Sequence, residues 1–85
     1  MPAVHRAGSL VVKVYGPPRE HPPPHAHVEV GRRGVVIVRL AIGDNPLRVW
    51  RVYGEVDDAT VLAAVRLVEA HEAAVRAAWE RIHGQ

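Results

Sequence analysis

The side chains best suited to chemistry are concentrated in residues 21–29, which read His-Pro-Pro-Pro-His-Ala-His-Val-Glu and hold three of the six histidines. The pKa of imidazole lies near neutral pH, so two imidazoles in a row can share general acid and general base work. His25 and His27 are therefore the catalytic candidates if the protein is an enzyme, which the sequence leaves open. The competing interpretation is structural: both are half-exposed strand residues that help to define the proline turn.

The same stretch does not favour a metal centre. A metal ion needs three or four ligands in a shell of about 2 Å. His25, His27 and Glu29 alternate along one strand, where successive ligands are about 6.5 to 7 Å apart at their Cα atoms. A straight polyproline run would hold His21 about 12 Å from His25, and a cis proline or a turn would be needed to bring them together. We therefore predict no metal site and no cofactor.

Residues 20–28 resemble the signature of the domain-of-unknown-function 4160 family, small prokaryotic proteins in which an acidic residue precedes His-x-Pro-Pro-His-x-His-Val. The opening Met1-Pro2, with Arg6 and Gly8, is similar to the start of that family. His71, eight residues before Trp79, is similar to its end. The resemblance implies an α+β fold and a gene often found beside another small protein, an arrangement like a toxin–antitoxin pair. It implies no particular activity.

The composition is that of an ordinary soluble domain. The chain has 85 residues, of which 48% are hydrophobic and 24% charged, so we expect a single domain over residues 1–85. No window approaches the roughly 18 to 20 apolar residues of a membrane span, and the N-terminus lacks the apolar region of a signal peptide. Cysteine is absent, which excludes disulfides and thiolate chemistry. These features predict a cytoplasmic protein with no membrane partner.

The charge is unevenly distributed along the chain. The net charge is +2, yet residues 1–54 carry eight Arg or Lys against three acids, and residues 55–85 carry three against six. A basic first half favours contact with phosphate, and therefore with nucleic acid. An acidic second half favours a basic partner or the protein's own sheet. The competing interpretation is that these charges only solvate the surface.

Alternation of apolar and polar residues predicts a mainly antiparallel sheet of three or four strands. Gly16 and the prolines after it end the first strand, and residues 31–34 suit a hairpin because glycine stands at both ends. The third strand is apolar on both faces and is therefore expected to be central. After an irregular start, the predicted strands cover residues 9–15, 25–30, 35–41 and 47–53.

The remaining residues predict one long helix packed on one face of that sheet, which makes the fold class α+β. Asp57 or Asp58 caps its start, and Gly84 follows its end at about His83. Such a helix is about 39 Å long, whereas a domain of this size is about 30 Å across. It must bend near residues 71–73, or one end protrudes and finds a partner. The apolar stripe that faces the sheet is Val61, Val65, Val68, Val75, Trp79 and Ile82, and it includes His71, expected to be buried with its ring bonded to a backbone carbonyl.

The polar face of the predicted sheet supplies the binding candidates. It combines cationic, aromatic and histidine side chains, a mixture that suits phosphate contact but is also common on a solvated sheet face. Trp50, Tyr53 and Trp79 are expected to pack in the core and at its rim rather than to form a stacking platform. The binding candidates are Lys13, Tyr15, His21, His25, His27, Glu29 and Arg39, with one of Arg48 or Arg51.

Two functions from different classes fit these residues. The leading hypothesis is a small cytoplasmic binding module that acts with a small partner protein in a toxin–antitoxin-like pair. The alternative is a metal-independent ribonuclease-like enzyme that uses His25 and His27 on a basic sheet face. A homodimer is expected in either case. It would form through the strand edge at residues 47–53 or through a protruding helix end that carries Val75, Trp79 and Ile82.

Overall fold

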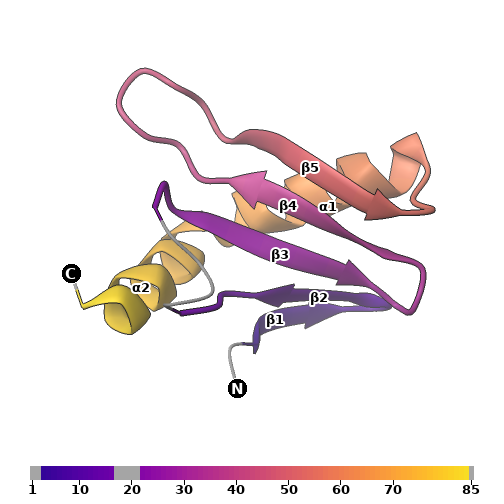
Figure 1. The fold of residues 1–85 in the computed structure, drawn as a ribbon, viewed down its shortest axis with the longest axis horizontal. Helices are drawn as coiled ribbons and strands as arrows, with labels where there is room; N and C mark the ends of the chain where they lie inside the picture. Colours follow the sequence, from indigo (N-terminus) through magenta and orange to yellow (C-terminus); the bar gives the residue numbers. More distant parts are fainter. Residues whose placement is uncertain (1–2, 17–21, 85) are drawn as a thin grey trace.

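The computed structural model describes residues 3–16 and 22–84, and it shows an α+β fold (Figure 1). Five antiparallel strands form one sheet in the sequential order β1-β2-β3-β4-β5, and two helices follow them. The elements are β1 (Ala3–Ala7), β2 (Leu10–Lys13), β3 (His25–Val30), β4 (Gly34–Arg39), β5 (Arg48–Gly54), α1 (Asp58–Ala70) and α2 (Glu72–His83).

The strands follow from the alternation in the sequence and from two demanding turns. In β3, Ala26, Val28 and Val30 are fully buried, while His27 and Glu29 between them are half-buried. Gly31 begins the β3–β4 turn in the left-handed region at φ 53°, which favours glycine. A Cβ atom at Gly34 would collide with the backbone carbonyl of Tyr53 on β5. Glycine at both ends of this turn therefore lets β3, β4 and β5 pair closely.

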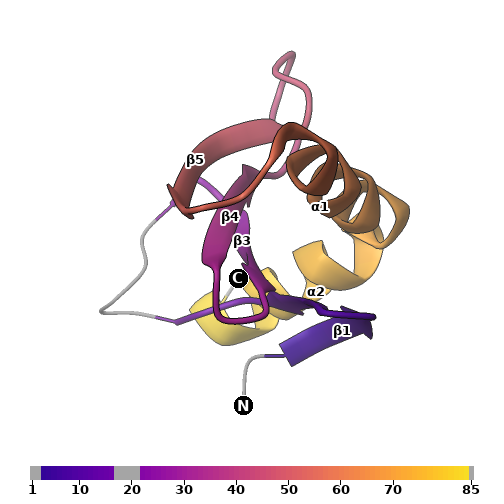
Figure 2. The same ribbon diagram turned by 90° about the vertical axis from the view of Figure 1, so that its right-hand side faces the viewer.

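The core lies between the sheet and the two helices, which cover the same face of a curved sheet (Figure 2). Each central strand contributes alternate valines, and the helices contribute the apolar stripe that the sequence predicts. Val68 and Val75 are fully buried, and Trp79 is 1% exposed. The core side chains of the sheet are Val12, Val14, Ala26, Val28, Val30, Val36, Val38 and Leu40.

The predicted single long helix is two helices that meet at His71, so of the two expected outcomes the bend near residues 71–73 is confirmed. The longest dimension of the described residues is 33 Å, so a straight helix of about 39 Å would overhang the sheet. The second helix is held by Glu72, whose carboxylate accepts from the Ala41 N–H at 3.2 Å, and by Arg76, which donates to the Ala41 carbonyl at 2.6 Å. The two side chains pair with each other at 3.0 Å. This clamp fixes the first turn of α2 to the end of β4.

The predicted helix ends are confirmed. Asp57 is the N-cap of α1, and its side chain accepts from the Thr60 N–H at 2.8 Å. Gly84 ends α2 in the left-handed conformation at φ 73°. Because the chain turns at His71, Val75 and Trp79 are covered by the sheet rather than left protruding. A homodimer through a protruding helix end is therefore no longer expected, because Val75 and Trp79 are already buried.

The strand count also needs correction. Residues 3–7, expected to be irregular, form edge strand β1, which pairs with β2 across the Gly8-Ser9 turn. The sheet therefore has five strands rather than three or four. The Pro22–Pro23 peptide is cis, so the proline run is not the straight polyproline segment that the sequence suggests. No helix in the described residues has the length and apolar character needed to cross a membrane.

Candidate functional site

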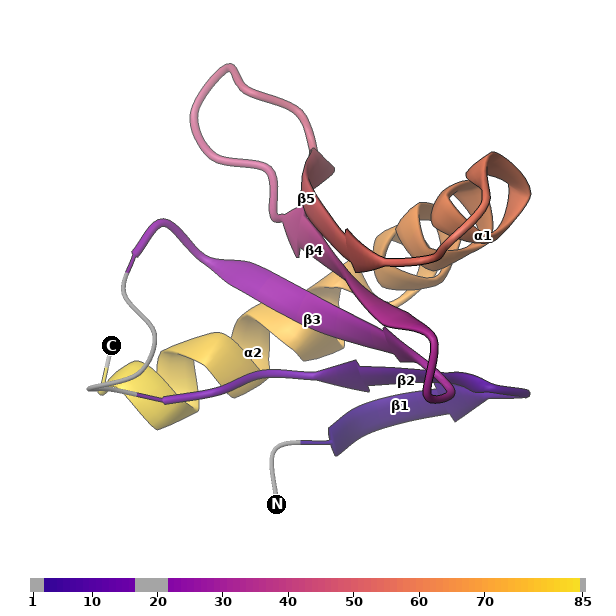
Figure 3. The ribbon, with the colours of Figure 1, turned by 45° about the vertical axis from the view of Figure 1, so that its right-hand side comes forward.

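Both helices lie on one side of the sheet (Figure 3). Strand register places most of the predicted binding residues on the other face. Lys13 of β2 is the register partner of His27 of β3, and His25 is the partner of Arg39 of β4. Because opposed residues in an antiparallel pair share a face, these four side chains lie on one surface with Glu29. We call this surface the open face. The remaining candidate, His21, lies outside the described residues.

At the β2 side of the open face, Glu29 is held by two neighbours. Its carboxylate forms a salt bridge with Lys13 at 3.0 Å and accepts from the Tyr15 hydroxyl at 3.0 Å. The hydrogen-bonded Lys13 ammonium, helped by the Tyr15 hydroxyl, lowers the pKa of Glu29 below its ordinary value although partial burial opposes the shift. Three of the predicted binding residues are therefore already engaged with one another.

The two histidines lie side by side but in different environments. Their ring centroids are 5.5 Å apart, and the Tyr15 ring meets His27 edge-on at 4.9 Å. His27 is half-buried, whereas His25 is 3% exposed. Nδ1 of His25 lies 2.8 Å from the Pro23 carbonyl. Because a carbonyl only accepts, Nδ1 carries the proton, and His25 ties the proline turn to the start of β3.

Aromatic rings from distant parts of the chain surround His25. Trp50 of β5 meets it edge-on at 5.3 Å, and Trp79 of α2 lies 5.1 Å away. Trp79 stacks on His83 at 3.7 Å, and Nε2 of His83 donates to the Tyr15 carbonyl at 3.0 Å. The histidine end of β3 is therefore a packed junction between the sheet and α2. Within the described residues, Nε1 of Trp79 is buried with no hydrogen-bond partner.

Sequence reasoning misplaced Trp50. A regular alternation puts it on the same face as Val52, but β5 has a bulge: Ile37 pairs with Arg51, and the next residue of β4 pairs with Val49. Trp50 consequently joins the open face, where the guanidinium of Arg39 lies 4.9 Å from its ring centroid. The indole is 41% exposed, so it is neither core nor fully covered.

The bulge creates an exposed surface that was only partly predicted. Arg48 is the register partner of Arg39, and Arg51 and Tyr53 pair with open-face positions of β4. All three β5 side chains are exposed, and Tyr53 is 52% exposed. The sequence signal was the order Arg-Val-Trp-Arg-Val-Tyr, in which cationic and aromatic residues follow each other. We call Arg39, Arg48, Trp50, Arg51 and Tyr53 the arginine–aromatic surface.

The remaining histidines do not extend the site. His71 is half-buried at the junction of the two helices, and its ring stacks on that of His5 at 3.8 Å. His71 was expected to be buried with its ring bonded to a backbone carbonyl; it is half-buried and its ring stacks on His5 instead, because strand β1, which the sequence did not reveal, lies against it. Within residues 3–16 and 22–84, no three His, Asp or Glu side chains are grouped so that they could hold a metal ion.

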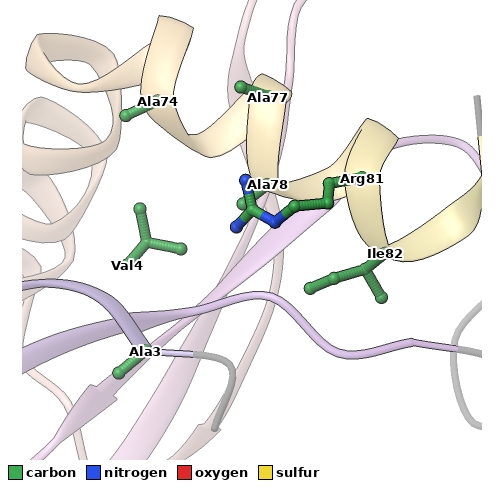
Figure 4. Close-up of a pocket in the computed structure, with 7 residues that line it drawn as sticks. All are labelled: Ala3, Val4, Ala74, Ala77, Ala78, Arg81 and Ile82. Atoms are coloured by element: carbon green, nitrogen blue, oxygen red, sulfur yellow. The ribbon is translucent and has the colours of Figure 1, made fainter.

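Two hollows lie away from the histidines. The smaller hollow, about 350 Å³, lies between β1 and α2. The side chain of Arg81 extends there beside three alanines of α2, Ala74, Ala77 and Ala78 (Figure 4). The larger, about 660 Å³, is an open groove between α1 and the β1–β2 turn. Its lining is apolar apart from one arginine: Ala7, Leu10, Ala59, Leu62, Ala63, Arg66, Leu67 and Ala70. We call it the α1 groove.

Comparison of the sequence and the structure with known proteins identified no relative. A scan against protein-family models found no match, and searches of curated proteins and of solved structures found none either. The resemblance to the domain-of-unknown-function 4160 family stays a prediction. The interpretation of the site therefore rests on its own contacts, burial and charge.

Proposed function

We propose that the protein is a small binding module that acts with a partner protein, as one member of a pair like a toxin and its antitoxin. The α1 groove is the observation that supports this proposal. Its volume of about 660 Å³ is within the range of ordinary binding pockets, and Leu62 at its rim is 49% exposed. The pairing with a second small protein is what the family resemblance implies.

The shape and chemistry of the α1 groove favour an amphipathic helix of the partner. Ala59, Leu62, Ala63 and Arg66 are spaced three and four residues apart, so they form one face of α1. Alanine at two of these positions lets another backbone come close. Arg66 supplies the positive charge in the lining, so the partner helix should place an acidic side chain against it.

The packing of the histidine row also supports binding rather than catalysis. His25 is enclosed by two tryptophans and donates to the Pro23 carbonyl. Glu29 is occupied by Lys13 and Tyr15. We infer that this row joins the sheet to α2, and that the functional contacts lie on the exposed surfaces.

The ribonuclease-like alternative keeps one supporting observation, the separation of 5.5 Å between the ring centroids of His25 and His27. A general acid and base must each come within hydrogen-bond distance of the phosphodiester. The burial of His25 opposes this requirement. We therefore rank binding above catalysis.

We also propose a homodimer through the edge of β5. This strand has seven residues, and its outer edge has no neighbouring strand in the described sheet. Val52 is 40% exposed, although it lies on the core side of the sheet. An antiparallel pairing centred on Val52 brings each Arg51 opposite a tyrosine and avoids opposing two arginines. Sedimentation should show a dimer at micromolar concentration, and a monomer at every concentration contradicts this proposal.

The partner proposal is tested by co-expressing the chain with the product of its neighbouring gene and measuring the affinity of the purified pair by calorimetry. Leu62→Glu places a charge on the wall of the α1 groove. We expect it to weaken the complex at least about tenfold, because a charge there would be buried against the apolar face of the partner helix. Ile42→Glu is the matched control, because Ile42 is 48% exposed and lies outside the groove.

The comparison of these two variants gives distinct outcomes. Loss of affinity in Leu62→Glu alone supports the groove as the interface. Equal affinity in both variants, with circular dichroism showing both folded, removes the groove. A chain that never co-purifies with the neighbouring product removes the partner proposal itself.

A further inference from the structure

We propose that the arginine–aromatic surface binds single-stranded nucleic acid, with arginines on the phosphates and Trp50 and Tyr53 stacking on bases. This surface lies on the opposite side of the sheet from the helices and shares no residue with the α1 groove. The inference rests on register, uncompensated charge and exposed aromatic rings.

Strand register places the cationic groups together. Arg39 and Arg48 are direct partners across β4 and β5, and Arg51 follows on the same face. Like charges directly opposite each other destabilise a sheet. Within residues 3–16 and 22–84, none of these three arginines forms a salt bridge with a carboxylate. The open-face carboxylate of Glu29 is neutralised by Lys13 instead. A ligand with several negative charges would relieve this repulsion.

A small recess at the end of the surface has room for about one phosphate oxygen. It has a volume of about 30 Å³ and lies where β4 and β5 leave the sheet. Space of this size holds about one water-sized group. Arg39 and Arg48 line it together with Asn45, so charged and neutral hydrogen-bond donors face the same point.

The aromatic rings indicate nucleic acid rather than another anion. Trp50 and Tyr53 are 41% and 52% exposed, and they are three residues apart on one strand, about 10 Å. Arg51 lies between them, so cationic and aromatic groups alternate along β5. Single-stranded nucleic acids are bound by this combination, in which bases stack on aromatic rings and the backbone follows positive charge. Tryptophan and tyrosine also suit a lipid interface, so the test includes anionic vesicles as a competing ligand.

The test is a fluorescence-anisotropy titration of a labelled 12-nucleotide single-stranded RNA at low salt. We expect the Arg48→Ala/Arg51→Ala variant to bind about tenfold more weakly or worse. We also expect the slope of log affinity against log salt to fall by about 1.4, because each lost phosphate contact on a single strand removes about 0.7. Arg6→Ala/Arg81→Ala is the matched control, since both arginines are exposed, neither is on β4 or β5, and the net charge falls equally. It should change the affinity less than about threefold.

The aromatic contribution is tested separately. Tyr53→Ala should weaken binding about fivefold or more, the lower limit for a base stacked on an aromatic ring. Tyr53 is highly exposed, so this change leaves the fold intact. Binding that weakens equally in both arginine variants overturns the proposal. An RNA affinity that Tyr53→Ala does not change also overturns it. So does an affinity for polyglutamate or phosphatidylserine vesicles equal to that for RNA, because each result would indicate an unspecific attraction for anions.

Discussion

The two ends of the open face differ in what they leave available. On β3, His25 is 3% exposed between two tryptophans, and Glu29 is bound by Lys13 and Tyr15. On β5, two strands away, arginine and aromatic side chains extend into solvent. The first region contains residue types that are common in catalytic sites, but they are buried or already paired. The second region contains side chains that a ligand can reach.

The residue types that could do chemistry and the residues that a ligand can reach are therefore in different places. The ring of His25 is packed between the sheet and α2 and donates to a backbone carbonyl, so it stabilises the fold but is poorly placed to exchange protons with a substrate. A strand that carries arginines beside another arginine and exposed aromatic rings costs stability, so its composition calls for a functional explanation. We therefore place structure at the histidine end and binding at β5.

The largest expected effect compares the two tryptophans. Trp79→Ala removes a side chain that is 1% exposed, so it should lower the free energy of unfolding by about 3 to 5 kcal/mol. Trp50→Ala removes a partly exposed side chain and should cost about 1 kcal/mol. Urea denaturation followed by far-UV circular dichroism measures both. If Trp79→Ala is too unstable to study, Trp79→Phe should still lower the unfolding free energy more than Trp50→Ala does.

The histidines should differ in the same direction. His25→Ala leaves a small cavity and removes the donor to the Pro23 carbonyl, which together should cost about 2 to 3 kcal/mol. His27→Ala, at a half-buried position, should cost about 1 kcal/mol or less. His25→Asn restores a donor near Nδ1 and should recover part of the loss. Equal stability of His25→Ala and wild type in urea would contradict a structural role.

The smallest expected effect concerns Glu29. The pKa of Glu29 is lowered in the folded protein, so the paired carboxylate stabilises the fold above its unfolded pKa, and this stabilisation is lost as pH falls through the folded pKa. Glu29→Gln should lower the unfolding free energy at pH 7 by up to about 1 kcal/mol, because the pair is partly exposed. The difference from wild type should shrink below about pH 4.

A control on an exposed acid completes the pH comparison. Glu80→Gln on α2 should change the unfolding free energy by less than about 0.5 kcal/mol. A gap between wild type and Glu29→Gln that widens as the pH falls would contradict the assigned ion pair.

The sequence predicts the α+β class because period-two and period-3.6 patterns are segregated along the chain. It also places Lys13, His25, His27 and Arg39 on one face, because strict alternation is kept in β3. It misses β1, since Ala3–Ala7 has too few β-branched or aromatic residues to stand out. Its pairing depends on the Gly8-Ser9 turn.

The other differences arise from tertiary contacts. The bend near residues 71–73 was one of the two outcomes that the length of the predicted helix allowed, but the clamp of Glu72 and Arg76 on the distant Ala41 backbone is in no local pattern. The placement of Trp50 depends on a bulge opposite Ile37, and a single extra residue shifts its side chain to the other face. The burial of His25 depends on Trp50 and Trp79, which are 25 and 54 residues away in sequence.

The most direct test of the central claim, that binding occurs on β5 and not through histidine chemistry, is one RNA incubation with two readouts. Labelled single-stranded RNA is mixed with protein in chelator, and binding is read by anisotropy and cleavage by a denaturing gel. We predict that the wild type binds the RNA and leaves it intact, and that Arg48→Ala/Arg51→Ala loses binding while His27→Ala retains it. Cleavage by the wild type that is abolished in a His25→Ala/His27→Ala variant would contradict the claim.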